Sequence, residues 1–248
     1  MQSELLTLNG VSLAYQTEEG ETVAIQNLNL HVHEGEFLAI VGPSGCGKTS
    51  VLSLIMGLIP QSAGTIERQK PDLRLGYMLQ RDHLLDHRTV EKNVLLGLEV
   101  QHRLTDESKA RALKLLDTYG LGDFINYKPQ QLSGGMRQKV ALIRTLALEP
   151  NLLLLDEPFS ALDYQTRLNL SDEVYRIIRH EHKTAILVTH DISEAVSMAD
   201  RVAVFSARPA TLKADIPIGF PAEMSPLERR KQAAFHDYFD RIWEELHV

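Results

Sequence analysis

An apolar run, a glycine-rich loop and a helix-like stretch follow one another directly between residues 37 and 58. The run FLAIV at 37–41 has no polar residue, as expected of a strand that is buried on both faces of a sheet. The loop GPSGCGKT occupies 42–49, and the stretch after it has the composition of a helix. A strand, a glycine loop and a helix in this order are what a phosphate-binding loop requires, so a parallel α/β sheet is predicted.

The loop matches the pattern G-x-x-x-x-G-K-[ST] through Gly42, Gly47, Lys48 and Thr49. The glycines let backbone N–H groups approach phosphate oxygens, and the following helix adds the positive potential of its N-terminus. Lys48 is predicted to reach the β- and γ-phosphates, and the Thr49 hydroxyl to ligate Mg²⁺. Cys46 is interpreted as a small filler of the loop, not as a redox group. The predicted phosphate-binding residues are Gly42, Pro43, Ser44, Gly45, Cys46, Gly47, Lys48, Thr49 and Ser50.

A second apolar run, LLLLDEP at 152–158, leads into two carboxylates. Asp156 closes the predicted strand and would stand beside Mg²⁺, normally through a water molecule. Glu157 can accept a proton from the water that attacks a γ-phosphate. In isolation such a pair is equally well a solvated strand end; the phosphate loop is what favours the catalytic interpretation.

Strands and helices alternate along most of the chain. Residues from about 88 to 150 look helical, with Asp106 as an expected N-cap and Gly120 at an expected helix C-terminus. A further helix is expected over 136–148. The remaining predicted strands lie at 152–156, 184–190 and 201–206, separated by helices at 165–182 and 192–200. This order predicts an α/β fold with a mostly parallel sheet that is covered on both sides.

The end of the chain has its own pattern. Ser225, Pro226 and Glu228 form a helix start with a capping box, which predicts an amphipathic helix over about 225–247. Its apolar face either packs on this protein's own surface, the favoured interpretation, or binds a partner. The residues of that face are Phe235, Tyr238, Phe239, Ile242 and Leu246.

The stretch LSGGM at 132–136 places Ser133, Gly134 and Gly135 at the start of a predicted helix. A hydroxyl and exposed N–H groups at a helix N-terminus form a second anion-binding device. One chain therefore carries two such devices for one nucleotide. With these motifs in this order, residues from about 4 to 206 resemble an ATP-binding-cassette (ABC) ATPase.

The resemblance implies a P-loop NTPase fold: a RecA-like core of mostly parallel strands, an N-terminal antiparallel β region and an inserted helical subdomain. The ATPase domain would span 1–206, with the helical insertion at about 88–150, and a C-terminal extension would span 207–248. The resemblance also implies a head-to-tail homodimer with ATP at its interface. In that dimer Ser133–Gly135 of one copy cover the γ-phosphate that the other copy's loop holds.

The resemblance also assigns roles to single residues. Tyr15 matches the aromatic residue that stacks on adenine. Asp163 matches the D-loop and is included in the nucleotide site. Gln80 matches a metal-binding glutamine, and His190 matches a switch histidine. In isolation, a glutamine or histidine at such a position would more often have no functional role. The implied catalytic residues are Glu157, His190 and Lys48, and the implied Mg²⁺ ligands are Thr49, Gln80 and Asp156.

Longer stretches, such as QRDHLLDHRTVEKNVLLGLE, resemble the ATPase subunits of importers for nitrate, sulfonate, taurine and related compounds. Those subunits work with a separate membrane permease and, indirectly, a solute-binding protein, which implies a place at the cytoplasmic face of the membrane. Many relatives have Pro-Trp where this chain has Asp86 and His87, in the segment where the family docks the permease.

Composition bears on the alternatives. The formal charge of -7 argues against a dedicated nucleic-acid binder, so no nucleic acid is expected as a partner. No apolar run approaches the 18 or so residues that a membrane span needs. Two other functions stay open: an ABC ATPase of an exporter or lipid-transport system, and a soluble ABC ATPase that acts on nucleic acid or in translation. Soluble members usually carry long insertions or two cassettes, which this chain lacks.

Overall fold

The computed structural model describes residues 3–17 and 20–247, and its largest sheet contains most of the predicted strands. Five of its six strands are parallel, and β9 runs antiparallel to β8. The predicted, mostly parallel sheet is therefore confirmed, and it continues past residue 206, where the sequence predicts the end of the ATPase domain. In spatial order the strands are β5 (Leu75–Met78), β6 (Leu152–Asp156), β7 (Thr184–Val188), β3 (Phe37–Val41), β8 (Arg201–Phe205) and β9 (Leu212–Pro217).

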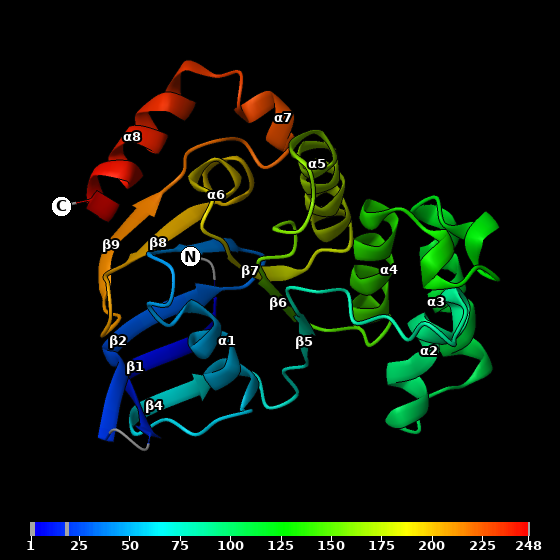
Figure 1. Ribbon diagram of the computed structural model, residues 1–248, viewed down its shortest axis with the longest axis horizontal. Helices are drawn as coiled ribbons and strands as arrows, with labels where there is room; N and C mark the ends of the chain where they lie inside the picture. The colour runs from blue at the N-terminus through cyan, green and yellow to red at the C-terminus, as the bar shows by residue number, and fades with distance from the viewer. Residues whose placement is uncertain (1–2, 18–19, 248) are drawn as a thin grey trace.

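The three central strands β6, β7 and β3 are buried along their whole length, because apolar layers cover both faces of the sheet. Along β6, Leu153 and Leu155 face one layer, and Leu152 and Leu154 face the other. The first layer contains α5 (Tyr164–His180) and α6 (Ile192–Met198), and the second contains α1 (Lys48–Met56), as Figure 1 shows above and below the sheet.

A smaller antiparallel sheet packs on the α1 side of the large sheet. The N-terminal antiparallel β region that the resemblance implies is therefore present, and its third, short strand is mostly exposed. Its strands lie in the order β2 (Gly20–His33), β1 (Glu4–Thr17) and β4 (Ala63–Arg68).

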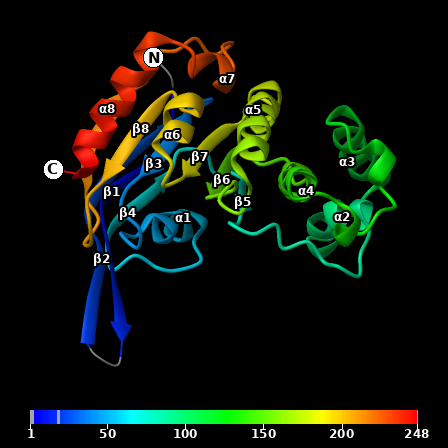
Figure 2. The ribbon, with the colours of Figure 1, turned by 45° about the horizontal axis from the view of Figure 1, so that its top comes forward.

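Three helices, α2 (Val90–Val100), α3 (Asp106–Thr118) and α4 (Gly134–Leu146), share a separate apolar cluster. Figures 1 and 2 show α2 and α3 set to one side of the sheets, with α4 between them and β5. The helical character expected of 88–150 is confirmed; the sequence predicts α3 and α4 as separate helices but does not single out α2. Gly120 has a φ of 73° just past α3, as predicted for a helix C-terminus.

Two details of these helices differ from the prediction. Thr105, not Asp106, caps α3, because the side chains of Thr105 and Ser108 each accept the other's backbone N–H. α4 begins at Gly134 and ends at Leu146, two residues earlier at each end than expected. The Ser133 side chain accepts the N–H of Met136 and so fixes this earlier start.

The predicted single helix over 225–247 is wrong: the segment forms α7 (Pro226–Arg229) and α8 (Ala233–His247). The capping box at Ser225 is present. Arg229, at the end of α7, is fully buried and donates hydrogen bonds to the carbonyls of Ser197 and Ala199. These bonds hold the end of α7 against the sheet layer, and the chain turns before α8 begins.

The apolar face of α8 packs on this protein's own surface, as favoured from the sequence. Phe235 and Ile242 are buried in the α5–α6 layer, and Tyr238, Phe239 and Leu246 pack against it. Figure 1 shows α8 lying beside α6 and β9.

Replacing Ile242 with alanine tests this packing. Ile242 is 0% exposed, so Ile242→Ala should lower the free energy of unfolding by about 3 kcal/mol through lost burial and a residual cavity. Urea unfolding measures this value. The exposed Glu244 on the same helix gives the control, Glu244→Ala, which should change it by less than about 0.5 kcal/mol. Equal effects of the two substitutions would show that α8 does not pack as described.

Candidate nucleotide-binding site

The glycine loop connects the end of β3 to the start of α1. Gly45 and Gly47 have φ values of 73° and 125°, which side-chain-bearing residues rarely adopt. Lys48 begins the helix, and its buried ammonium group donates to the carbonyls of Gly42 at 2.8 Å and Pro43 at 3.0 Å. The loop therefore curves around its own lysine, which is the shape expected of a phosphate-binding loop.

A cavity of about 230 Å³ lies over this loop. Glu157, from the end of β6, contributes to its wall together with loop residues, so the two main motifs of the sequence meet in one site. The lining residues are Ser44, Gly45, Gly47, Lys48, Thr49, Ser50, Glu157 and Arg208.

Asp156 is the last residue of β6 and is 4% exposed. Its carboxylate accepts hydrogen bonds from the hydroxyls of Thr49 at 3.0 Å and Tyr77 at 3.1 Å. Burial raises the pKa of this carboxyl above its usual range, although both hydroxyls partly oppose the shift. Thr49 and Asp156, predicted to share a metal ion, are thus in direct contact.

Glu157 lies at the point where Gln80 and His190 converge. Its Oε2 is 3.1 Å from Nδ1 of His190, and Nε2 of Gln80 donates to the same oxygen at 3.4 Å. The Glu157 backbone has a φ of 45°, and its N–H donates to the carbonyl of Val188. Three residues predicted from separate motifs therefore share one carboxylate.

Tyr15 lies at the side of the loop, where its hydroxyl is 3.0 Å from Oγ of Ser50. Its side chain is 40% exposed, which leaves ring surface for a flat ligand. This position agrees with the predicted adenine contact, which stays a prediction.

Ser133 and Asp163 are absent from the described residues that line this cavity. Both are exposed N-caps, of α4 and α5 respectively, and the two helix starts adjoin one another. A Cβ built on Gly134 would lie 3.1 Å from Leu162, and one on Gly135 would lie 3.3 Å from Thr166. The LSGGM segment thus forms a second exposed surface outside its own chain's phosphate cavity.

The segment after Gln80 is hydrogen-bonded to α4, the helix that starts within the LSGGM motif. Asp82 accepts from Arg137 at 2.9 Å, and Arg144 donates to the backbone carbonyls of Asp82 and His83. The cavity and the exposed LSGGM surface are therefore joined through one short loop.

Sequence reasoning missed Arg208, which follows β8 and lines the cavity. Its guanidinium group donates to the carbonyl of Gly45 at 2.9 Å. A signal existed: β8 adjoins β3, and the carboxyl ends of parallel strands meet at the same edge of a sheet. A basic residue just past β8 is therefore a natural candidate to reach the phosphate loop.

Comparisons with known proteins agree with this geometry. The family described as "ABC transporter" matches residues 25–160. The chain is 46% identical over 247 residues to an ABC transporter ATP-binding protein of Bacillus subtilis, YtlC, with 97% of this chain and 95% of that protein covered. This chain belongs to the ABC transporter family. It is an ABC ATPase, as the sequence predicts.

Two further comparisons extend this assignment. The nitrate import ATP-binding protein NrtD of Synechocystis sp. is 38% identical over 252 residues, covering 98% of this chain and 94% of that protein. A solved dimeric ATP-binding cassette in a post-hydrolysis state, bound to ADP and Pi, is 30% identical with a TM-score of 0.73. That match covers 87% of this chain and 100% of the other. The predicted P-loop NTPase fold is confirmed.

Behind the site of this ABC ATPase lies a buried glutamate that the motifs do not include. Glu194 is 4% exposed and accepts a 2.7 Å hydrogen bond from Thr189, the residue before His190. Nε of Arg167 is 3.8 Å from Oε1 of Glu194, which is beyond hydrogen-bond distance. Burial raises the pKa of Glu194 from its usual 4.5 to about 7.

The raised pKa predicts a pH-dependent stability. Folded Glu194 holds its proton up to about pH 7, whereas the unfolded chain releases it near pH 4.5. Protonation of Glu194 therefore stabilises the folded state fully below pH 4.5, and this contribution is lost as the pH rises through 7. Glu194→Gln removes the titration. As the pH rises from about 5 to about 8, the free energy of unfolding of the wild type should fall by about 3 kcal/mol relative to that of the Glu194→Gln variant. Urea unfolding at each pH measures the gain, and a pH-independent difference would contradict the assignment.

Proposed function

We propose that this chain binds and hydrolyses ATP to drive uptake of a small organic compound or anion through a separate membrane permease. The observation that carries the proposal is the position of Glu157. Its carboxylate lines the same cavity as the phosphate loop while Gln80 and His190 hold it from two sides. A base beside a phosphate cradle is the arrangement that hydrolysis of a terminal phosphate requires.

The nucleotide contacts follow from the cavity. Lys48 bonds two carbonyls of its own loop, and it would exchange them for phosphate oxygens when a triphosphate enters. Arg208, which lines the same cavity, can add a second cation. The exposed ring of Tyr15 would stack on adenine.

The donor set at Asp156 fits Mg²⁺. The described residues contain no group of three or more His, Cys, Asp or Glu side chains that could hold a metal ion by themselves. Mg²⁺ instead favours one or two carboxylates completed by phosphates and water. Among the described residues, the hydrogen-bond partners of the buried Asp156 carboxylate are two hydroxyls, so a cation would offset its charge. Thr49 and the amide oxygen of Gln80 would be the other protein ligands, and the ion would neutralise charge on the phosphates.

Glu157 would take the proton of the attacking water on its Oε2, the oxygen that His190 and Gln80 already position. His190 would stabilise charge that develops on the γ-phosphate. The remaining contacts, Ser133–Gly135, would come from a second copy that binds head to tail, with Asp163 beside them. Closure of the two copies would exclude water and complete the site.

Import is favoured over the other transport modes and over a soluble role by the names of the relatives. They include the nitrate import protein and ATP-binding proteins for choline and bicarbonate transport. Within 3–17 and 20–247, no helix has both the length and the hydropathy to cross a bilayer. A separate membrane-spanning permease, served by a solute-binding protein, would supply the path, and this chain would bind it at the cytoplasmic face of the membrane. The segment 81–90, bonded to α4, would carry the motion to it.

The first test replaces the proposed base. Glu157→Gln should lower ATP turnover about a thousandfold, because an amide cannot accept the proton. It should also leave ATP trapped in a stable dimer. A coupled ATPase assay measures the first effect, and size-exclusion chromatography with ATP and Mg²⁺ measures the second. Glu223→Gln, at an exposed position, is the control and should behave as wild type. Ordinary turnover in Glu157→Gln would reject the assignment.

The second test addresses the LSGGM surface. Ser133→Arg should lower turnover at least about 100-fold by blocking closure and removing donors to the γ-phosphate. Equilibrium titration of the monomer with a fluorescent ATP analogue should give an almost unchanged affinity, since Ser133 lies outside its own chain's cavity. Ala110→Arg adds the same charge at an exposed site on α3 and should change neither value. A large loss of monomer affinity in Ser133→Arg would contradict a role in a second copy's site.

A further inference from the structure

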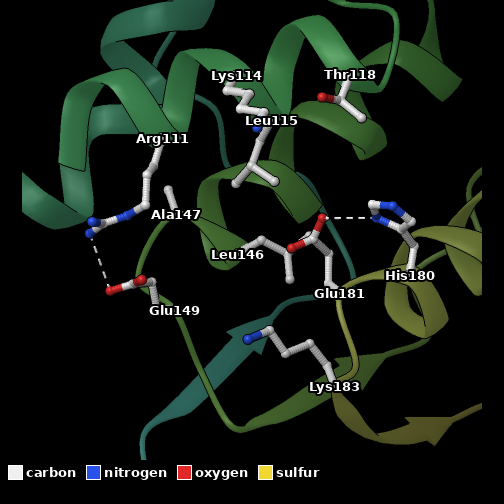
Figure 3. Close-up of a pocket in the computed structure, with 10 residues that line it drawn as sticks. All are labelled: Arg111, Lys114, Leu115, Thr118, Leu146, Ala147, Glu149, His180, Glu181 and Lys183. Carbon is white, nitrogen blue, oxygen red and sulfur yellow. Dashed lines mark hydrogen bonds and ion pairs between the residues drawn. The ribbon is translucent and has the colours of Figure 1, made fainter. Parts of the chain in front are cut away.

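A second cavity, of about 320 Å³, lies near the N-terminal ends of the strands of the large sheet, whereas the nucleotide site lies at their C-terminal ends. It opens where β6 and β7 begin, whereas Asp156 and Glu157 lie where β6 ends. Its walls come from α3, from the end of α4, and from the turn between α5 and β7. It therefore lies between the group of helices α2–α4 and the sheet layers. Figure 3 shows its lining residues.

The floor of this cavity is apolar and its rim is charged. Leu115 of α3 and Leu146 of α4 line it together. Lys114 and Lys183 extend toward it from opposite sides, with the two leucines between them (Figure 3). At this volume the cavity is at the small end of the range for ligand pockets.

The two carboxylates on the rim already have partners. Glu149 is within 3.7 Å of three arginines, Arg74, Arg103 and Arg111. Glu181 accepts a hydrogen bond from Tyr119 and lies 3.3 Å from Nδ1 of His180. The arginines offset the charge of Glu149, and the carboxylate of Glu181 is already engaged in hydrogen bonding.

The two lysines do not have such partners. Within 3–17 and 20–247, neither Lys114 nor Lys183 makes a side-chain hydrogen bond or ion pair. Two unpaired ammonium groups over an apolar floor, beside carboxylates that already have partners, favour a ligand that brings its own negative charge.

We propose that this cavity binds an organic anion that has one carboxylate-like head and an apolar body. The head pairs with the ammonium group of Lys183, the body packs on Leu115 and Leu146, and Lys114 adds positive potential from the other side. Bound there, the anion bridges α3 to the segment that leads into β7. It reinforces a connection that Tyr119 already makes with Glu181.

The test uses benzoate as the probe, on the full chain with ADP present to fill the nucleotide site. Methyl NMR spectra report on Leu115, Leu146 and Ala147, which line the cavity. Benzoate should shift these methyl signals with a dissociation constant on the order of 1 mM, as expected for a ligand of this size. Benzamide, which has the same shape without the charge, should bind at least about tenfold more weakly. Inorganic phosphate, which lacks the apolar body, should not shift these methyl signals.

Variants separate this cavity from general attraction to a basic surface. The double substitution Lys114→Ala and Lys183→Ala should weaken benzoate binding about fivefold or more. Lys92→Ala, at another exposed lysine, should have no effect. Equal binding of benzamide and benzoate, unchanged binding in the double variant, or no shift at about ten times the expected dissociation constant would each overturn the proposal. Competition with ADP would also overturn it, because it would place the anion in the nucleotide cavity, whose own function is tested separately by Glu157→Gln.

Discussion

The burial of three parallel strands on both faces positions the phosphate loop, the two carboxylates and the histidine of the nucleotide site. β3, β6 and β7 have no exposed residue, so their register is strongly determined by packing. All three end at the same edge of the sheet. The phosphate loop, the Asp156–Glu157 pair and His190 each come directly or almost directly after one of these ends. Chemistry from three distant parts of the sequence meets because these three strands are parallel neighbours in the sheet.

Glu157 is the point at which these parts depend on one another. Gln80 and His190 both contact one oxygen of its side chain, and its backbone has a positive φ. Gln80 is followed at once by Asp82, which is bonded to Arg137 on α4, the helix that LSGGM begins. A change at the γ-phosphate position can therefore alter the position of Glu157, of the loop after β5 and of the exposed LSGGM surface. This chain of contacts gives a physical route from the nucleotide toward partners outside the chain.

Local signals in the sequence were enough for the core strands, the phosphate loop and most helices, because burial and glycine geometry are encoded within a few neighbouring residues. The misses depend on contacts distant in sequence. Arg208 reaches Gly45 only because β8 and β3 are neighbours in the sheet. The split between α7 and α8 depends on the burial of Arg229 against carbonyls near the end of α6. The choice of Thr105 over Asp106 as a cap is finer than composition can decide, since both residues are good caps.

The central claim is that a complete hydrolytic site needs the phosphate loop and Glu157 of one copy and the LSGGM segment of another. Mixing two inactive variants tests it most directly. Glu157→Gln chains are combined, before ATP is added, with Ser133→Ala chains, which lose the hydroxyl donor without the bulk that blocks closure, and turnover is compared with that of each variant alone. Random pairing should restore about a quarter of the wild-type rate, because half of the dimers then hold one intact site of two. A mixture as inactive as its components, although its chains pair, would contradict the account.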